Sequence, residues 1–336
     1  MLVKNYFAAA NGYNGFRSYF GEIFKSEKFK RIYVLKGGPG TGKSSLMKRI
    51  AKESLKHGAN HDKIYCSSDP RSLDGVIVHT QSGDCAIIDG TAPHERDAII
   101  PGAIDTIINI GDNFNNAILR ERRNEILRHT KDKKDAYINA YTLLKSAGAI
   151  AERINRILKE SLLIKEAEAL AESLLHDVEA DDSKSSIALI HAFCKDGKCQ
   201  VDNFSYPQKR VKIDGSYGEE YIFLNIIRDK SRQNPLSISY DPLDEKSPDG
   251  LLVGDTFFYA SETPSSRCIN TADLLIDFPR EMISALHRMR ATLLSEAQMH
   301  FNSASKSHFM LESLYSDAVN FERNDMICDQ IIKEIF

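Results

Sequence analysis

The sequence has no long hydrophobic run. It contains no stretch of about 18 uninterrupted apolar residues, which is roughly what a membrane-spanning helix requires. Its first residues, MLVKNYFAAANGYNGF, also lack the apolar core of a secretory signal peptide. These two absences predict a cytoplasmic protein that has no membrane partner.

Neither sign of charge is in large excess. The chain has 44 Lys and Arg against 47 Asp and Glu, which leaves a formal net charge of -3. A protein that binds nucleic acid over a broad surface usually carries a surplus of basic residues. Nucleic acid is therefore not expected as a partner.

Cysteine is sparse, with six residues in a chain of 336. A chain of this length does not need disulfides to stabilise its core, so we expect reduced thiols in a reducing compartment. Only Cys194 and Cys199 lie close together, in CKDGKC, where the Asp-Gly pair suggests the end of a hairpin. A metal site would need further ligands, and no second cysteine pair supplies them.

The strongest motif lies in RIYVLKGGPGTGKSSLMKRIAKE. Residues 32–35 are apolar and predict a buried strand, and residues 45–55 carry apolar side chains at helical spacing. Between them, residues 37–44 satisfy G-x-x-x-x-G-K-[ST], the pattern of a phosphate-binding loop. The residues predicted to bind a nucleotide are Gly37, Gly38, Pro39, Gly40, Thr41, Gly42, Lys43, Ser44 and Ser45.

Each residue type in this loop has a physical reason. Glycine allows positive φ and close approach, so the amides of residues 40–44 can point at phosphate oxygens near the helix N-terminus. Lys43 would reach the β- and γ-phosphates, and the hydroxyl of Ser44 would bind Mg²⁺. Ser45 can equally be a residue on the helix face.

A second acidic element follows in CAIIDGTAPHE, where Asp89 ends an apolar segment that predicts a strand. Asp89 is the candidate for holding Mg²⁺ together with Ser44; an Asp-Gly pair alone would be an ordinary turn, but the phosphate loop upstream favours the metal role. His94 and Glu95 lie five and six residues after Asp89 and are candidates for orienting a water or accepting a proton. No N-K-x-D segment is present to read guanine, so ATP is expected rather than GTP.

The chain repeats itself. The series YVLKGGPGTGKSSLMKRI, YCSSDPRSLDGVIV, CAIIDGTAPHE and GAIDTIINIGDNF is followed, in the same order, by RVKIDGSYGEEYIFLNII, ISYDPLDEKSPDGLLV, TFFYASETPSS and NTADLLIDFPREM. Matched landmarks keep a slowly changing separation: Asp69 and Asp241 by 172 residues, Pro93 and Pro264 by 171, Asp105 and Asp273 by 168. An internal duplication explains this order.

The second copy has lost the residues that the chemistry needs. Lys43 and Ser44 have no equivalents in GSYGEEY, where Glu219 and Glu220 would repel phosphate. Asp89 falls opposite Ala260. The second half is therefore not expected to bind Mg-ATP.

With VLKGGPGTGKSSLM, YCSSDPRSLDGVIV and IIDGTAPHE in its first half, the chain resembles a family of poorly characterised bacterial P-loop ATPases built from two tandem P-loop halves. The resemblance spans nearly the whole chain. It implies ATP binding and hydrolysis, and it supplies no substrate. Family members usually carry a recognisable second phosphate loop, from which this sequence departs at residues 212–221.

These patterns predict an α/β protein with two P-loop NTPase-like parallel-sheet halves in tandem, each followed by a long helical region. The predicted segments are an NTPase domain (1–113), a helical insert or hairpin (114–178), a linker (179–187), a degenerate half (188–279) and a C-terminal helical region (280–336). The apolar stripes of the two helical regions predict packing on each other, on a partner protein or on a second copy. HTKDKKDA, residues 129–136, predicts a bend within the first of them.

The leading functional hypothesis is a Mg-dependent ATPase in which Lys43, Asp89, His94 and Glu95 take part in catalysis and ADP is the product. Two alternatives remain open: a kinase that transfers the γ-phosphoryl group to a small molecule, and an ATP-sensing adaptor with negligible turnover. Arg267, Arg280 or a second chain could supply an arginine finger.

Overall fold

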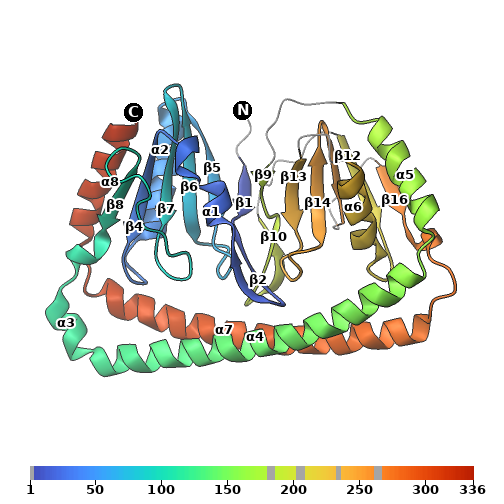
Figure 1. The fold of residues 1–336 in the computed structure, drawn as a ribbon. Coiled ribbons are helices and arrows are strands. Elements are labelled where there is room, and N and C mark those ends of the chain that lie inside the picture. Colours follow the sequence, from blue (N-terminus) through green and yellow to red (C-terminus); the bar gives the residue numbers. More distant parts are fainter. Residues whose placement is uncertain (1–3, 180–185, 202–208, 232–235, 261–266) are drawn as a thin grey trace.

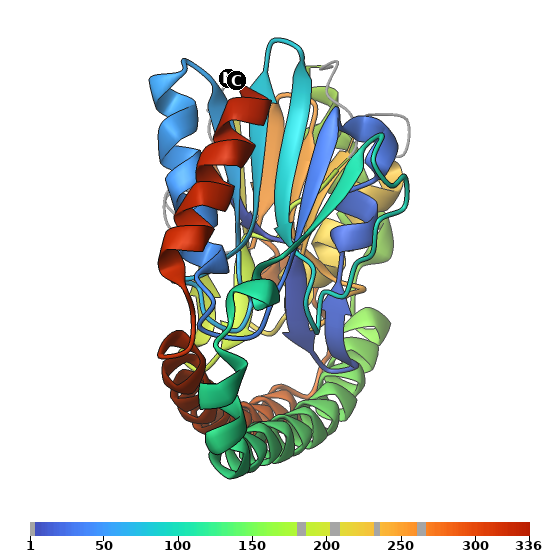
Figure 2. The same ribbon diagram turned by 90° about the vertical axis from the view of Figure 1, so that its left-hand side faces the viewer.

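The computed structural model describes residues 4–179, 186–201, 209–231, 236–260 and 267–336. Two six-stranded sheets stand next to each other, and two long helices run across the same edge of both (Figure 1). Seen from the side, these helices curve beneath the sheets (Figure 2). In the described segments, no helix is both long and apolar enough to span a bilayer.

The first sheet has one antiparallel strand at its centre. Its order is β1 (Asn5–Phe7), β5 (Asn60–Tyr65), β6 (Leu73–Thr80), β7 (Gly83–Asp89), β4 (Arg31–Lys36) and β8 (Asp105–Asn109). β6 runs antiparallel to both neighbours, whereas β7, β4 and β8 are parallel. Helix α2 (Lys43–Lys56) follows β4. Short helical segments complete this half: α1 (Phe20–Ile23), η1 (Ser26–Lys28), η2 (Ile110–Asn113) and α3 (Asn116–Glu121).

The second sheet repeats the first strand for strand. Its order is β9 (Ser186–Ile187), β13 (Leu236–Tyr240), β14 (Pro248–Val253), β15 (Thr256–Tyr259), β12 (Lys209–Asp214) and β16 (Arg267–Asn270). Here β14 is the antiparallel strand, helix α6 (Glu219–Lys230) follows β12, and η3 (Ala272–Leu274) follows β16. The same order with the same strand directions bears out the tandem architecture.

Each half also contains a β-hairpin. In the first half it is β2 (Ala9–Gly12) with β3 (Gly15–Ser18), and in the second it is β10 (His191–Cys194) with β11 (Gly197–Gln200). The second hairpin brings the Cys194 and Cys199 sulfurs to 3.5 Å, and both thiols are free. The hairpin predicted from CKDGKC is therefore present.

The expectation of parallel sheets holds only in part, because each sheet contains one antiparallel strand. β6 and β7 are separated by two residues, 81 and 82. A parallel connection needs a crossover of roughly a dozen residues or more, so this short link forces the antiparallel direction. β14 and β15 are also two residues apart and are also antiparallel.

The structure also corrects two of the matched landmarks. Tyr65 pairs with Leu73 in the first sheet and Tyr240 with Pro248 in the second, so each counterpart lies 175 residues later. In that register the structural counterpart of Asp69 is Asp244 and not Asp241.

The second correction concerns the end of the repeat. Asp105 begins β8, whereas Asp273 lies in η3. The counterpart of Asp273 in the first half is therefore Asp112, which lies in η2. The sequence did not reveal either pairing, because insertions and deletions change the spacing between the matched positions. Pro264 lies outside the described residues.

Two long helices connect the halves. α4 (Arg123–Glu160) and α7 (Arg280–Ser316) pack against each other, and backbone bridges join Phe114 to Val319 and Leu162 to Leu275 at their ends. The two helices are therefore antiparallel, and we call the pair the helical arch. The predicted bend at residues 129–136 was wrong: α4 is continuous there, and its charged side chains form a largely exposed face.

The last helix of each half packs on the opposite half. α5 (Ile164–His176) follows α4 and packs against α6 in the core of the second sheet. α8 (Phe321–Ile335) follows α7 and packs against α2 in the core of the first. The predicted insert 114–178 and C-terminal region 280–336 thus each complete the other half. The predicted linker includes residues 180–185, which are not among the described residues, and Ser186–Ile187, which form β9.

The sheets also meet directly. The backbones of Phe7, the last residue of edge strand β1, and Leu189, just after edge strand β9, exchange two hydrogen bonds of 2.8 and 3.1 Å. Both side chains are fully buried in a small apolar cluster between the halves. The arch and this contact together fix the two sheets relative to each other.

Candidate functional site

The predicted phosphate loop lies between β4 and α2, at the carboxyl end of β4. We call residues 37–42 the first loop. Gly40 and Gly42 have φ of +67° and +84°, a region that glycine adopts without strain, and Gly42 caps the N-terminus of α2. The strand–loop–helix arrangement expected from the sequence is therefore present.

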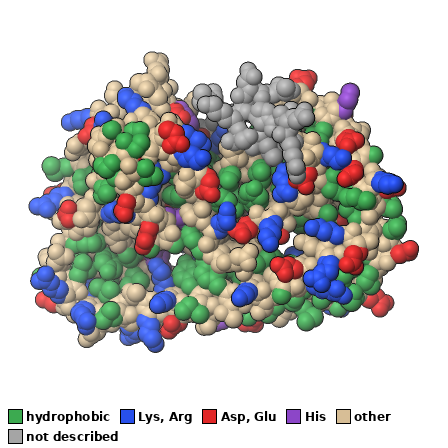
Figure 3. Space-filling model, viewed as in Figure 1, with side chains coloured by type: hydrophobic (Ala, Val, Ile, Leu, Met, Phe, Trp, Pro, Cys, Tyr) green, Lys and Arg blue, Asp and Glu red, His purple; other side chains and the backbone are tan. Residues whose placement is uncertain are grey.

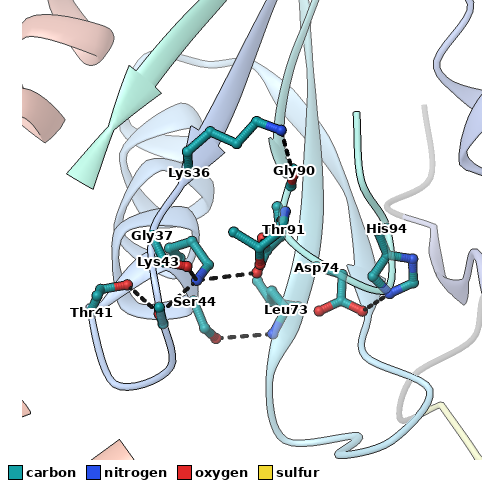
Figure 4. Close-up of polar contacts among 12 residues, drawn as sticks. Lys36, Gly37, Thr41, Lys43, Ser44, Leu73, Asp74, Gly90, Thr91 and His94 are labelled. Carbon is teal, nitrogen blue, oxygen red and sulfur yellow. Dashed lines mark hydrogen bonds and ion pairs between the residues drawn. The ribbon is translucent and has the colours of Figure 1, made fainter. Parts of the chain in front are cut away.

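Lys43 is the first residue of α2 and reaches back over the first loop. Its Nζ donates hydrogen bonds to the carbonyls of Gly37 at 2.7 Å and Gly38 at 2.9 Å (Figure 4). It also lies 3.6 Å from Oδ2 of Asp89. Only 9% of Lys43 is exposed, so its ammonium is held between the loop and a carboxylate.

Asp89 reaches this position because β7 lies parallel to β4. Leu35 and Asp89 are paired across the two strands, so both strands end at the same edge. Oδ1 of Asp89 accepts hydrogen bonds from the amide of Thr91 at 2.9 Å and from its hydroxyl at 2.6 Å. Burial raises the pKa of Asp89, and the Lys43 ammonium opposes that shift only in part.

The other hydroxyls of the motif have different surroundings. Oγ of Ser44 accepts a hydrogen bond from the Leu73 amide at 2.9 Å, and Oγ1 of Thr41 donates to the Gly38 carbonyl at 2.8 Å. Pro39 is partly buried, whereas Ser45 is exposed on the outer face of α2. Ser45, which the sequence left open as either a binding residue or a residue of the helix face, therefore lies on the helix face.

Asp74 is a site residue that the sequence reasoning missed. Because β6 is antiparallel, its first residues lie at the edge where β4 and β7 end, next to Leu73 and Ser44. Asp74 is 7% exposed, and its charge contributes to the raised pKa of Asp89. The signal was available in the repeat: SLDG and SPDG both contain this aspartate, and its counterpart Asp249 is fully buried.

His94 is enclosed and interacts with Asp74. Its Nε2 lies 3.1 Å from Oδ2 of Asp74, and its ring stacks on Phe20 with the centroids 4.3 Å apart. His94 is only 6% exposed, so its side chain is enclosed by its neighbours. This geometry lets His94 orient Asp74.

Glu95 lies one residue further and is exposed. Within the part of the chain that the structure describes, no hydrogen bond or ion pair joins it to the first loop. Its predicted role in orienting water stays a prediction.

The helical arch and α8 cover the first loop. A Cβ on Gly40 would lie 2.2 Å from the Glu312 carbonyl of α7, and one on Gly38 would lie 3.3 Å from the Tyr315 ring. Nδ2 of Asn324, in α8, donates to the Thr41 carbonyl at 2.8 Å. The loop therefore needs glycine at position 40 for close contact as well as for its backbone angles.

The two arginines considered as fingers lie elsewhere. Arg280 begins α7 with its guanidinium over the Phe278 ring, and Arg267 lies in β16 with its guanidinium 3.4 Å from Asp177. Both arginines therefore lie in the half of the molecule that contains the second sheet. Within this chain, the structure places neither of them at the first loop.

The second half has a shorter loop, residues 215–218, which we call the second loop. Gly218 caps α6 with φ +103°, as Gly42 caps α2, so Glu219 stands where Lys43 stands. The Glu219 carboxylate accepts hydrogen bonds from the amides of Ser216 at 2.9 Å and Tyr217 at 2.8 Å, and its side chain is fully buried. An internal carboxylate thus takes the amides that a phosphate would need.

A cavity of about 530 Å³ lies between the second loop and the helical arch. Its walls carry both signs of charge, with Glu220 and Asp241 on one side and Arg288 and Arg290 of α7 on the other. On the outer face drawn in Figure 3, acidic and basic side chains are also interspersed. The cavity therefore lacks the uniformly positive lining that a triphosphate favours.

Oxygen donors at the first loop fit Mg²⁺. The ion prefers oxygen ligands and is commonly held by one or two carboxylates together with substrate phosphates. Ser44, Asp89 and Asp74 supply a hydroxyl and two carboxylates around Lys43. Over the described residues, no three His, Cys, Asp or Glu side chains form a cluster that could hold a metal by themselves. Phosphate oxygens would have to complete the coordination.

No protein-family model, no curated protein and no solved structure matches this chain.

Proposed function

We propose that this protein binds Mg-ATP at the first loop and hydrolyses it there, and that both halves have a P-loop NTPase-like fold. The observation that carries the proposal is the position of Lys43 at the N-terminus of a 14-residue helix, with its ammonium between the loop carbonyls and Asp89. A helix N-terminus, a glycine loop and a lysine make a phosphate site together. The motifs shared with tandem P-loop ATPases support the same proposal.

Each residue has a defined task in this proposal. Lys43 leaves the carbonyls of Gly37 and Gly38 and binds the β- and γ-phosphates, while the loop amides bind further phosphate oxygens. Ser44 and Asp89 hold the metal, and Mg²⁺, when bound, supplies positive charge that neutralises the phosphates. Asp74, oriented by His94, accepts a hydrogen bond from the attacking water. Glu95 stays the alternative for that last task.

The second half supports the first without chemistry of its own. Glu219 places a carboxylate where Lys43 places an ammonium, and it occupies the amides of the second loop. Ala260 stands opposite Asp89 in the strand register and offers no metal ligand. We therefore propose one nucleotide site per chain.

A nucleotide-sensing role is the second candidate, because the first loop touches the helical arch and α8 directly. The contacts of Gly40 with Glu312 and of Thr41 with Asn324 would transmit a change in the loop to helices that reach the other half. In that case turnover is slow and the bound state is the signal. A kinase would differ by requiring an acceptor molecule.

The test is nucleotide affinity and phosphate release for the wild type, Lys43→Ala and the control Lys52→Ala, an exposed residue of the same helix. We expect Lys43→Ala to weaken ATP binding at least about tenfold, or about 1.4 kcal/mol, and to abolish release, with Lys52→Ala unchanged. ATP binding without phosphate release would favour the sensor. A phosphorylated acceptor in place of free phosphate would identify a kinase. A wild type that binds no nucleotide would contradict all three.

A further inference from the structure

Lys133 of α4 faces the first loop from the helical arch. Its Nζ donates a hydrogen bond of 3.2 Å to Nδ1 of His308 on α7. Among the described residues, no carboxylate lies within ion-pairing distance of Lys133, whereas the nearby Lys131 pairs with Asp135. A partly buried ammonium therefore has a neutral hydrogen-bond partner and no ion-pair partner at the inner face of the arch.

Lys133 reaches the first loop through α7: it is bonded to His308, which lies one turn before Glu312, and the Glu312 carbonyl lies 2.2 Å from a Cβ placed on Gly40. Burial lowers the pKa of Lys133, Cys66 and Glu312 oppose that shift, and the charge of Lys43 adds to it. Burial also lowers the pKa of His308 to about 4, and the charges of Lys133 and Lys43 both contribute. His308 is consequently uncharged near neutral pH, so its Nδ1 can accept a hydrogen bond from the Lys133 ammonium. Two ammonium groups from opposite walls thus repel each other across one site.

Of the acidic groups near this space, Glu312 attracts both ammonium groups, and the others have partners of their own. Asp89 is engaged with Lys43, Asp69 with Arg71, and Asp74 with His94. Glu312 lies on α7 within 3.6 Å of His308, and burial raises the pKa of its carboxyl. An anion that enters between Lys43 and Lys133 would therefore gain from both ammonium groups.

We infer that Lys133 binds the terminal phosphate of the nucleotide held by the first loop, so that the helical arch completes the triphosphate site. The inference rests on the proposed function. It assigns to this chain the positive charge that Arg267 and Arg280 do not supply. It also makes the arch sensitive to whether the γ-phosphate is present, because ADP would not reach Lys133.

The internal repeat offers a matched control. α4 and α7 begin at Arg123 and Arg280, and α5 and α8 begin at Ile164 and Phe321, so both helix pairs are 157 positions apart. In that register Lys133 corresponds to Arg290, which lines the cavity at the second loop. Arg290 has the same charge and the same place in the fold, but it faces a loop that Glu219 has filled.

The experiment compares ATP and ADP affinity for the wild type, Lys133→Gln, Lys133→Arg and Arg290→Gln. We expect Lys133→Gln to weaken ATP binding about tenfold and ADP binding less than about twofold, because only ATP has the third phosphate. Lys133→Arg should keep most of the ATP preference, and Arg290→Gln should change neither affinity. Thermal unfolding without nucleotide reports whether each variant is folded, and Lys133→Met, which keeps the aliphatic stem, replaces Lys133→Gln if that variant is not.

Equal loss of ATP and ADP affinity, or no loss, would overturn the role of Lys133. A loss of the same size in Arg290→Gln would overturn it too, because the effect would then follow net charge or arch stability. Failure of the proposed function looks different: the wild type would bind neither nucleotide, or Lys43→Ala would bind both as well as the wild type does.

Discussion

At the scale of single residues, the two halves differ most at the position after the capping glycine. Lys43 and Glu219 both begin a helix and both reach back over their own loops, with opposite charge. Lys43 donates to two carbonyls, and Glu219 accepts from two amides. One side chain thus leaves the amides of its loop available to an anion, and the other occupies them.

Glu220 gives a pH-dependent prediction. Its Oε2 is buried and has no hydrogen-bond partner among the described residues, and burial raises its pKa from 4.5 to about 7, with the charge of Glu219 adding to the shift. Between these values the folded state keeps a proton that the unfolded state has lost, so stability falls as the pH rises from 4.5 to 7. The loss amounts to about 3 kcal/mol at most.

Glu220→Gln should remove this loss. We expect the variant to exceed the wild type in free energy of unfolding at pH 8, with the difference shrinking toward pH 4.5, as measured by denaturant titration. Phosphate release should stay within about tenfold of the wild type, because we propose that hydrolysis takes place at the first loop alone. A difference in stability that does not vary with pH would refute the assigned titration.

The sequence predicted the site residues that belong to contiguous motifs. It did not predict those that only the fold brings close to the motifs. Lys43, Ser44 and Asp89 follow from two contiguous motifs, and the structure places them together. Asp74 is the second residue of an antiparallel strand, so its approach to Asp89 depends on a strand direction that the sequence did not predict. Lys133 approaches through a helix far along the chain, which no local pattern reveals.

At the scale of elements, α8 contributes to both the core and the loop of the first half. Its buried residues Cys328, Ile331 and Ile335 pack on α2 in the first core, and its Asn324 bonds to the first loop. The amphipathic pattern of residues 321–335 predicts a packed helix, yet it cannot tell which half the helix packs on. The exchange of α5 and α8 was therefore beyond sequence reasoning.

Ile331→Ala tests this packing. Ile331 is 2% exposed, and removal of a buried isoleucine side chain costs about 2–5 kcal/mol. We expect a loss of that size in the free energy of unfolding of the first half, measured by denaturant unfolding. The control Met326→Ala alters a residue of the same helix that is 70% exposed, and it should cost less than about 0.5 kcal/mol. Equal effects of the two variants would contradict the placement of α8 on α2.

At the scale of the whole molecule, the repeat is a closed arrangement. Each half sends its long helix across to the other half, and the helix that follows completes the other core. The first loop touches the end of α7 and the start of α8, and the second loop touches the end of α4, where Leu158 lies 3.8 Å from a Cβ placed on Gly218. The two ends of the arch are thus equivalent in structure but face loops of different chemistry.

Hydrogen exchange should expose this difference. If ATP binds between the first loop and the arch, local opening becomes less frequent there, and the amides of residues 312–324 should exchange more slowly with ATP than without it. The equivalent amides, residues 155–167, face the loop that Glu219 fills and should change little. Exchange followed by mass spectrometry, with and without ATP, compares the two segments within one molecule. Equal protection of both would mean that the nucleotide stiffens the whole arch, and protection of neither would mean that the nucleotide does not engage it.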